Sequence, residues 1–467
     1  MSFISYDFLI FFLIVFILYW LTPGHRWQNI LLLAASAVFY GWLAPWHTVI
    51  LFVSTSIDFF LALGMARWKS RASILMWVGI VLNLGLLASV KYFFVYDDAL
   101  AVWAQHAGFL IDSSFLSIIL PLGVSFYTLK KISYLIEVRR GTFPAARDFI
   151  AFAAYVSFFP QVFSGPIDRP QKLLRQLESP RVWEAGHFYN AWQLILMGLF
   201  KKIVIANTVK VFVDQIFLMK EPSLVFLIVG GLGFTLQILA DFSSYTDLSR
   251  GVAFLLGLNT SENFDKPYLS FTPSEFWNRW HMSFSFWLRD YIFFPIRRML
   301  LRAPNIPGFV AQIVPPLATM FLSGLWHGTG ATFIVWGLYY GILIVIYQML
   351  GIRGDWKPIN PFKRFATWLI MFFFIAFGWV IFRVQSLNWM WHALTKSPFA
   401  HSTEEVTAAL VILTMISFYA FLLFIKHIFD QYGSKQLNLH ALYYTFATVL
   451  TVIFINSSSP DFIYFQF

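Results

Sequence analysis

Apolar runs of about 20 residues recur along most of this chain, and short polar loops separate them. A helix of that length spans the hydrocarbon core of a bilayer and satisfies its own backbone hydrogen bonds there. Charged residues make up 12% of the sequence, about half the share found in soluble domains. The chain is therefore predicted to be an all-α polytopic membrane protein rather than a soluble enzyme.

This pattern predicts about 11 to 12 transmembrane helices, together with re-entrant or interfacial helices. The expected spans are 7–21, 29–43, 48–65, 74–95, 114–129, 203–218, 224–240, 309–326, 331–349, 366–382, 406–425 and 441–457. The first run has neither a basic start nor a small-residue cleavage site, so it is expected to be a span and not a signal peptide. Because no soluble domain or internal repeat is visible, residues 1–467 are expected to form one membrane-embedded domain.

Loop charges predict how the spans are oriented. The loops around Lys69 and from Lys130 to Arg147 are basic, whereas the loop between them, 95–113, has aspartates and no lysine or arginine. Basic loops of membrane proteins face the cytoplasm. This bias predicts an extracytoplasmic N-terminus, and it accounts for the net charge of +10 without a nucleic acid partner.

Two regions, 130–202 and 241–308, do not have the pattern of simple spans. The first contains an apolar run, Phe149 to Phe163, which Pro160 interrupts and which is too short to cross a bilayer comfortably. A re-entrant or interfacial helix is expected there. Irregular backbone at membrane depth is stable only where protein or a water-filled cavity covers it. Two such regions in one chain therefore predict a functional cavity.

The stretch from Phe276 to Pro295 is the most unusual part of the second region. Its aromatic residues recur at steps of three and four, which is the spacing of one helix face. These residues are Trp277, Trp280, Phe284, Trp287 and Tyr291. The stretch is predicted to be a helix at a membrane interface, with this face toward the lipid.

His281 lies within this stretch and is flanked by charged residues. Arg279 precedes it, and Arg289 and Asp290 follow. Paired arginines can bind a phosphate or a carboxylate in forked geometry. The alternative is an interfacial helix whose arginines lie among lipid headgroups. The residues alone leave both interpretations of His281 open.

A second histidine, His327, follows Trp326 where an apolar run gives way to a Gly-Thr-Gly turn. Histidine is uncommon at membrane depth, and its near-neutral pKa suits a general base for a hydroxyl acceptor. The alternative is a structural histidine that bonds a backbone carbonyl at a helix end. We expect His281 and His327 to meet in the protein interior, with Trp326 as a supporting residue.

Polar residues cluster at the end of the seventh predicted span. Gln237, Asp241 and Ser244 are spaced by four and three, which places them on one helix face, and Asp247 follows. Carboxylates at membrane depth are costly unless they are paired. A structural polar network is expected here rather than direct catalysis, and Asp58 is expected to pair internally in the same way.

The sequence has no cysteine, which removes disulfides, thiolate metal sites and a cysteine acyl-enzyme from consideration. Its ten histidines show no spacing typical of a zinc site. We therefore expect no metal and no bound cofactor.

Several ordered motifs carry a resemblance to a known family. They are LPLGVSFYTLKKISYLIEVRRG (120–141), FPQVFSGPIDRP (159–170), ADFSSYTDLSRG (240–251), RWHMSFSFWLRDYIFFP (279–295), LWHG (325–328), WGLYYG (336–341), GWVIFR (378–383) and FIYFQF (462–467). Together they resemble the membrane-bound O-acyltransferases, specifically the bacterial branch that contains alginate O-acetyltransferases. The sequence departs from many relatives at Tyr340, where histidine is common, so no role is assigned to that position.

The resemblance implies a ring of helices around a thinned centre, with an outer funnel for the acceptor and a cytoplasmic tunnel for a thioester donor. It implies that His327 is the catalytic base and His281 the second functional position. The implied reaction moves a short acyl group, with acetyl favoured, from acetyl-CoA or an acyl carrier to hydroxyls of an extracytoplasmic polysaccharide. Transfer is direct or passes through an extracytoplasmic partner protein. The implied location is a bacterial cytoplasmic (inner) membrane.

Other functions stay open at this stage. D-alanyl transfer to teichoic acid is the close enzymatic alternative. A transporter or flippase would normally show internal repeats, and the sequence shows none. A scaffold for polysaccharide export would tolerate loss of both histidines. The residues do not distinguish among the possible acceptors, which are alginate, cellulose, another exopolysaccharide and peptidoglycan.

Overall fold

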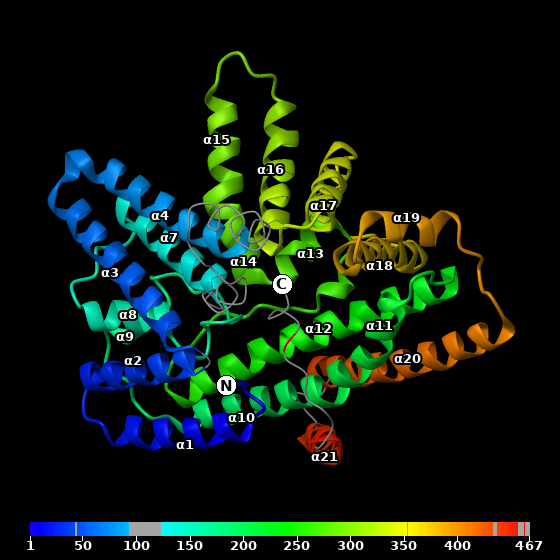
Figure 1. Ribbon diagram of the computed structural model, residues 1–467, viewed down its shortest axis with the longest axis horizontal. Helices are drawn as coiled ribbons and strands as arrows, with labels where there is room; N and C mark the ends of the chain where they lie inside the picture. The colour runs from blue at the N-terminus through cyan, green and yellow to red at the C-terminus, as the bar shows by residue number, and fades with distance from the viewer. Residues whose placement is uncertain (43, 93–122, 353, 433–436, 456–461, 463–467) are drawn as a thin grey trace, which may run out of the picture. The chain divides into compact units, whose positions relative to one another are not determined.

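The computed structural model describes residues 1–42, 44–92, 123–352, 354–432, 437–455 and 462. Within these ranges the chain forms helices joined by turns and loops, which confirms the all-α prediction (Figure 1). The structure falls into two compact units. The single domain expected over 1–467 stays a prediction, and each unit is described by itself.

The first unit comprises Met1–Leu194 and Leu248–Glu262. Its helices are α1 (Tyr6–Leu21), α2 (His25–Gly41), α3 (Pro45–Arg67), η1 (Lys69–Arg71), α4 (Ala72–Tyr92), α7 (Val124–Arg140), α8 (Phe149–Ser157) and α9 (Leu173–Leu177). Parts of α10 (Ala185–Leu199) and α12 (Leu224–Leu255) also belong to it.

Local side chains set the limits of these helices. The Ser5 hydroxyl accepts a hydrogen bond from the N–H of Phe8 at the start of α1, and the Asp148 carboxylate accepts one from Ile150 at the start of α8. α7 ends at Gly141, whose φ of 76° lies in the left-handed region that glycine adopts at little cost.

The predicted run Phe149–Phe163 forms only the nine-residue α8 and a following turn. Every residue from Ala151 to Phe163 is buried. The run is too short to span a bilayer, as predicted. It is not an interfacial helix, however, because no face of it is left to lie on a membrane surface.

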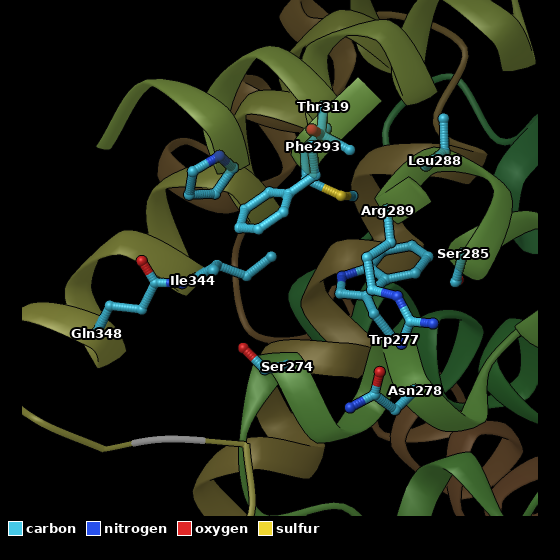
Figure 2. Close-up of a pocket in the computed structure, with 12 residues that line it drawn as sticks. Ser274, Trp277, Asn278, Ser285, Leu288, Arg289, Phe293, Thr319, Ile344 and Gln348 are labelled. Carbon is cyan, nitrogen blue, oxygen red and sulfur yellow. The ribbon is translucent and has the colours of Figure 1, made fainter. Parts of the chain in front are cut away.

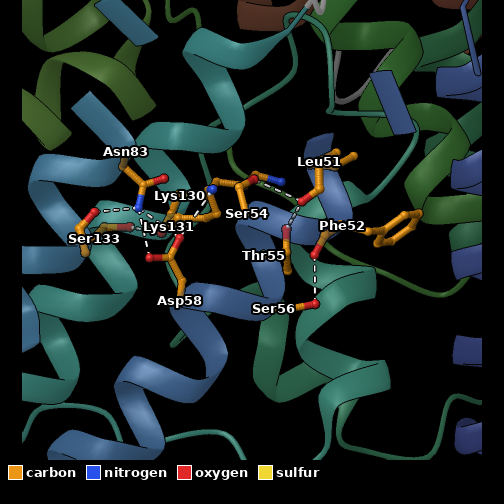
Figure 3. A network of polar contacts seen from close by, with 11 residues as sticks. Leu51, Phe52, Ser54, Thr55, Ser56, Asp58, Asn83, Lys130, Lys131 and Ser133 are labelled. Atoms are coloured by element: carbon orange, nitrogen blue, oxygen red, sulfur yellow. Dashed lines mark hydrogen bonds and ion pairs between the residues drawn. The ribbon is translucent and has the colours of Figure 1, made fainter. Parts of the chain in front are cut away.

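A buried ion pair joins three helices of the first unit (Figure 3). The Lys131 ammonium lies 3.3 Å from the Asp58 carboxylate, and both side chains are at most 1% exposed. The Asn83 amide donates to both carboxylate oxygens, at 2.9 and 2.8 Å. The predicted internal pairing of Asp58 is therefore confirmed, and it offsets the cost of burying two charges between α3, α4 and α7.

The second unit comprises Ile195–Asp247 and Asn263–Phe467. Besides its parts of α10 and α12, its helices are η3 (Phe200–Ala206), α11 (Asn207–Leu218), η4 (Pro267–Leu269), α13 (Pro273–Arg279), α14 (Met282–Leu288), η5 (Arg289–Phe293), α15 (Phe294–Arg302), α16 (Val310–His327), α17 (Ala331–Met349), α18 (Pro361–Arg383), α19 (Leu387–Thr395), α20 (Thr403–Tyr432) and α21 (Leu437–Phe454).

Six helices of the described chain are long and apolar enough to cross a membrane. They are Pro45–Arg67, Lys69–Lys91, Leu224–Leu255, Ala331–Met349, Pro361–Arg383 and Thr403–Phe429. The other predicted spans fall on helices that are shorter or less apolar. Residues 93–122, which include the predicted loop 95–113 and the first part of the span 114–129, lie outside the described residues. The multi-pass class is thereby confirmed, whereas the count of about 11 to 12 spans stays a prediction.

Small residues let α16 and α17 approach closely. A Cβ added at Gly337 would press on the backbone carbonyl of Met320, and one added at Gly324 would press on that of Phe333. Backbone cannot move aside as a flexible side chain can, so both positions require glycine. Close contact of this kind is how membrane helices gain packing energy.

We predict that Gly337→Val forces α16 and α17 apart and costs roughly 1–3 kcal/mol or more of stability. The measurement is the thermal unfolding midpoint of purified protein in detergent. Gly308→Val is the matched control, because a Cβ at Gly308 meets nothing within contact distance. Equal midpoints for the two variants would contradict this description of the helix pair.

Candidate active site

The segment predicted as one continuous helix breaks at His281. α13 ends at Arg279, Trp280 is extended, and His281 has a φ of 42°, in the left-handed region. α14 then begins at Met282, followed by the π-helical turn η5. The single-helix prediction is therefore wrong.

The loop before α13 supplies the cause of this break. Trp280 forms an isolated antiparallel bridge with Phe264, and the N–H of Met282 donates to the carbonyl of Asn263 at 2.9 Å. The Asn263 side chain accepts from the N–H of Ser283 at 3.2 Å. These bonds replace helical ones and hold a non-glycine residue in a conformation that costs about 1–3 kcal/mol.

The break also changes where the aromatic residues point. Trp280, Phe284, Trp287 and Tyr291 are all buried, at 2%, 1%, 6% and 9% exposure. The prediction that this face lies against lipid is therefore wrong. The rings instead pack within the second unit, where Phe284 contacts both histidines.

His281 is 1% exposed and packed between rings. Its ring centroid lies 4.8 Å from that of Phe242 and 5.1 Å from that of Phe284. His281 lies outside the candidate membrane spans, and burial lowers its pKa from the usual 6.5 to about 3. The imidazole is therefore neutral at physiological pH and offers one N–H donor and one nitrogen acceptor.

His327 is the last residue of α16 and is 5% exposed. Its ring contacts Trp336 of α17 at 5.0 Å and Phe382 of α18 at 5.2 Å, measured between centroids. Gly328 follows in extended conformation and ends the helix. Three helices therefore fix the position of this imidazole.

The two histidines rest on the same pair of aromatic rings. Phe284 stacks on Trp326 at 4.3 Å, and each histidine contacts both rings. His281 lies 5.1 and 6.4 Å from Phe284 and Trp326, and His327 lies 6.0 and 4.9 Å from them. The structure thus brings both residues to one buried aromatic cluster, with Trp326 at its centre.

A cavity of about 160 Å³ lies among α13, α14, η5, α16 and α17 (Figure 2). Its lining includes Ser274, Trp277, Asn278, Arg289, Thr319 and Gln348. The Trp277 ring meets Trp336 at 5.6 Å, and Trp336 in turn meets His327. Two indole rings in contact therefore link the cavity lining to the His327 imidazole.

A stripe of polar side chains on α16 begins at the cavity lining and ends at His327. Thr319, Ser323 and His327 are spaced by four, so they share one helix face. Among the described residues, the hydroxyls of Thr319 and Ser323 and the indole N–H groups of Trp277 and Trp336 have no hydrogen-bond partner. Buried polar groups normally have partners, so this stripe suits a polar ligand.

The two predicted arginines, Arg279 and Arg289, have different partners, and Asp290 pairs with the second of them. Arg279 pairs with Glu275 one turn earlier on α13, at 2.9 Å. Arg289 lies 3.2 Å from Asp290 and covers the Phe286 ring at 4.4 Å, while its side chain is 44% exposed. Only Arg289 lines the cavity, so it is the arginine placed to meet an anionic ligand.

The predicted polar residues of α12 lie in the second unit, where Gln237, Asp241 and Ser244 are buried and Asp247 is partly exposed. Lys202 pairs with Asp241, and Lys201 pairs with Asp247, both at 2.7 Å. The Ser244 hydroxyl donates to the carbonyl of Asp241. Gln237 is buried on the same face, and its amide oxygen has no hydrogen bond within the described residues. None of these residues lines the cavity beside Arg289.

Comparison with known proteins identifies the class to which this fold and site belong. Residues 146–391 match the model of the membrane-bound O-acyltransferase family, which is more than half of the chain. The chain therefore belongs to the membrane-bound O-acyltransferases, and it is an acyltransferase of the membrane.

Relatives of three kinds lie within this family. The chain is 35% identical over 415 residues to a protein of Pseudomonas aeruginosa named probable alginate O-acetylase, covering 87% of this chain and 76% of that one. It is 29% identical to a peptidoglycan O-acetyltransferase of Helicobacter pylori, covering 81% and 75%. It is 30% identical to a teichoic acid D-alanyltransferase of Bacillus subtilis, covering 56% and 68%.

We predict that Asp241→Asn destabilises the protein by roughly 3–5 kcal/mol, because it leaves the Lys202 ammonium buried beside a neutral amide. The double variant Asp241→Leu/Lys202→Met removes both charges and is expected to regain most of that loss. Thermal unfolding midpoints of the wild type and the single and double variants measure the coupling. A double variant no better than Asp241→Asn would contradict the pairing.

Proposed function

We propose that this enzyme transfers an acetyl group from a cytoplasmic thioester to a hydroxyl of an extracytoplasmic polysaccharide. Two relatives with extensive coverage carry names that describe O-acetylation, of alginate and of peptidoglycan. The single structural observation behind the proposal is His327, buried at the inner end of a polar stripe that begins in the Arg289 cavity.

In the proposed reaction, His327 acts as general base. A neutral nitrogen of its imidazole takes the proton of the acceptor hydroxyl while the hydroxyl oxygen attacks the thioester carbonyl carbon. The carbon–sulfur bond of the tetrahedral intermediate then breaks. The imidazolium returns its proton to the departing thiolate, so the products are the ester and a free thiol.

His281 is assigned to the carbonyl oxygen. Because burial keeps its pKa far below neutrality, it acts as a neutral N–H donor and not as a cation. A preorganised donor aimed at a developing oxyanion contributes on the order of 10²- to 10³-fold to the rate. The surrounding aromatic rings exclude water, which strengthens that hydrogen bond and protects the thioester from hydrolysis.

The donor arm is assigned to the cavity and the polar stripe. A coenzyme A or carrier-protein donor presents its thioester on a long arm with amide groups and a phosphate. In this proposal the Arg289 guanidinium binds that phosphate at the cavity, where its side chain is 44% exposed. Amide groups of the arm would form hydrogen bonds with the hydroxyls of Thr319 and Ser323, which have no other partner among the described residues. The thioester end of the arm would then lie at His327.

The wider setting belongs to the same proposal. The enzyme would lie in a bacterial cytoplasmic membrane with its N-terminus outside, because its predicted inner loops are basic. Transfer would be direct or pass through an extracytoplasmic acetyltransferase partner. D-alanyl transfer to teichoic acid is the alternative function, since one relative is named a teichoic acid D-alanyltransferase. A comparison of acetyl and D-alanyl thioesters as donors distinguishes the two functions.

We predict that His327→Ala lowers thioester turnover by about 10²- to 10⁴-fold, because the hydroxyl loses its general base. The assay uses purified full-length protein in nanodiscs with radiolabelled acetyl-CoA, a soluble oligosaccharide acceptor, and a D-alanyl thioester as the competing donor. His392→Ala is the matched control, because His392 lies on α19 and outside the cavity. Full turnover in His327→Ala would overturn the mechanism.

We predict that Arg289→Ala raises the KM for acetyl-CoA about tenfold or more with a smaller change in kcat, because it removes a phosphate contact distant from the reacting carbon. The salt dependence of KM should weaken in the same variant. Arg297→Ala on α15 is the control, since Arg297 does not line the cavity. An unchanged KM would exclude Arg289 from donor binding.

A further inference from the structure

The second unit contains another cavity, of about 370 Å³, which shares no residue with the cavity at Arg289. It lies among α10, α12, α20 and the loop that includes η4. Its lining combines lysines with leucine and phenylalanine side chains. None of these residues belongs to the polar stripe on α16 or takes part with the two histidines in the proposed mechanism.

The charged part of this cavity is basic. Lys201, Lys266 and Lys426 line it together with His427, against the carboxylate of Asp247. Lys201 is held by Asp247 at 2.7 Å and by the Ser243 hydroxyl at 2.8 Å. Lys266 is exposed, and its φ of 49° places it in the left-handed region at the start of η4. Three lysines and one aspartate line the cavity, so the lining carries a net positive charge that favours an anionic ligand.

The apolar part of the cavity follows two candidate membrane spans. Leu236 and Leu239 come from α12, and Leu423 and Phe424 come from α20. Lys426 lies just beyond them on α20, near the end of the apolar segment Thr403–Phe429. An apolar wall along the spans with cations at their end matches the two parts of a phospholipid.

We propose that this cavity binds an anionic phospholipid, with the lipid phosphate on Lys266 and Lys426 and an acyl chain against Leu236, Leu239 and Phe424. Basic pockets between membrane helices bind lipid phosphates in this manner. The acyl chain distinguishes such a ligand from a soluble phosphate, which the cations alone would also attract. The site stands independently of the acyl transfer proposed above.

The test is lipid binding to delipidated full-length protein, followed by native mass spectrometry. Short-chain phosphatidylglycerol, short-chain phosphatidylcholine and inorganic phosphate are titrated separately. Phosphatidylglycerol is expected to bind best and to weaken as salt rises. Lys266→Ala/Lys426→Ala should weaken it about thirtyfold, since each lysine near a lipid surface contributes about 1 kcal/mol.

Further variants distinguish a bound lipid from a soluble phosphate and from a misfolded protein. Leu239→Trp fills the apolar part, so it should weaken phosphatidylglycerol and leave inorganic phosphate unchanged. Lys266→Arg/Lys426→Arg keeps both charges and should retain binding, which controls for misfolding of the alanine variant. Lys69→Ala/Lys396→Ala removes two exposed lysines outside the cavity and should bind normally.

Three outcomes would overturn the proposal. Equal binding of phosphatidylcholine would show that the lysines do not select the headgroup. Equal losses of phosphatidylglycerol affinity in Lys266→Ala/Lys426→Ala and Lys69→Ala/Lys396→Ala would show that binding depends on the net charge of the protein and not on this cavity. Inorganic phosphate that displaces phosphatidylglycerol at similar concentration, with no effect of Leu239→Trp, would indicate a soluble phosphate ligand instead.

Discussion

The geometry of the candidate active site depends on the hydrogen bonds between Asn263 and the backbone of Met282 and Ser283. These bonds interrupt a helix that the aromatic spacing would otherwise continue, and they hold His281 at a φ of 42°. The chain turns there, so the residues before and after His281 face the interior. Without that turn, Phe284 would not lie between His281 and His327.

The aromatic cluster then determines the chemistry available to both imidazoles. Trp326 and Phe284 contact both histidines, and Trp336 contacts both His327 and Trp277, which lines the cavity at Arg289. Burial in these surroundings lowers the pKa of His281 to about 3, so its imidazole is uncharged at physiological pH. In the proposed mechanism the positive charge for the donor comes from Arg289, whose side chain lines the cavity and is 44% exposed.

Some of this arrangement could be predicted from the sequence, because it depends on local pattern. The span 331–349 agrees with α17 because glycines precede and follow an uninterrupted apolar run. The break at His281 could not be predicted, since its cause is a loop 18 residues earlier that no local periodicity records. Thr319 and Ser323 could have been found by their spacing of four from one another and from His327. Two hydroxyls in an apolar helix do not by themselves indicate a site, however, and only the cavity lined by Thr319 suggests a role for them.

The most direct test of the central claim is a cryo-electron microscopy structure of the full-length protein with a thioether analogue of acetyl-CoA, which binds but cannot react. The account predicts phosphate density at Arg289, an arm along Thr319 and Ser323, and the sulfur within roughly 4 Å of the His327 ring. Analogue density that enters elsewhere, or a sulfur separated from His327 by the Trp336 ring, would contradict the assignment of His327 as the base.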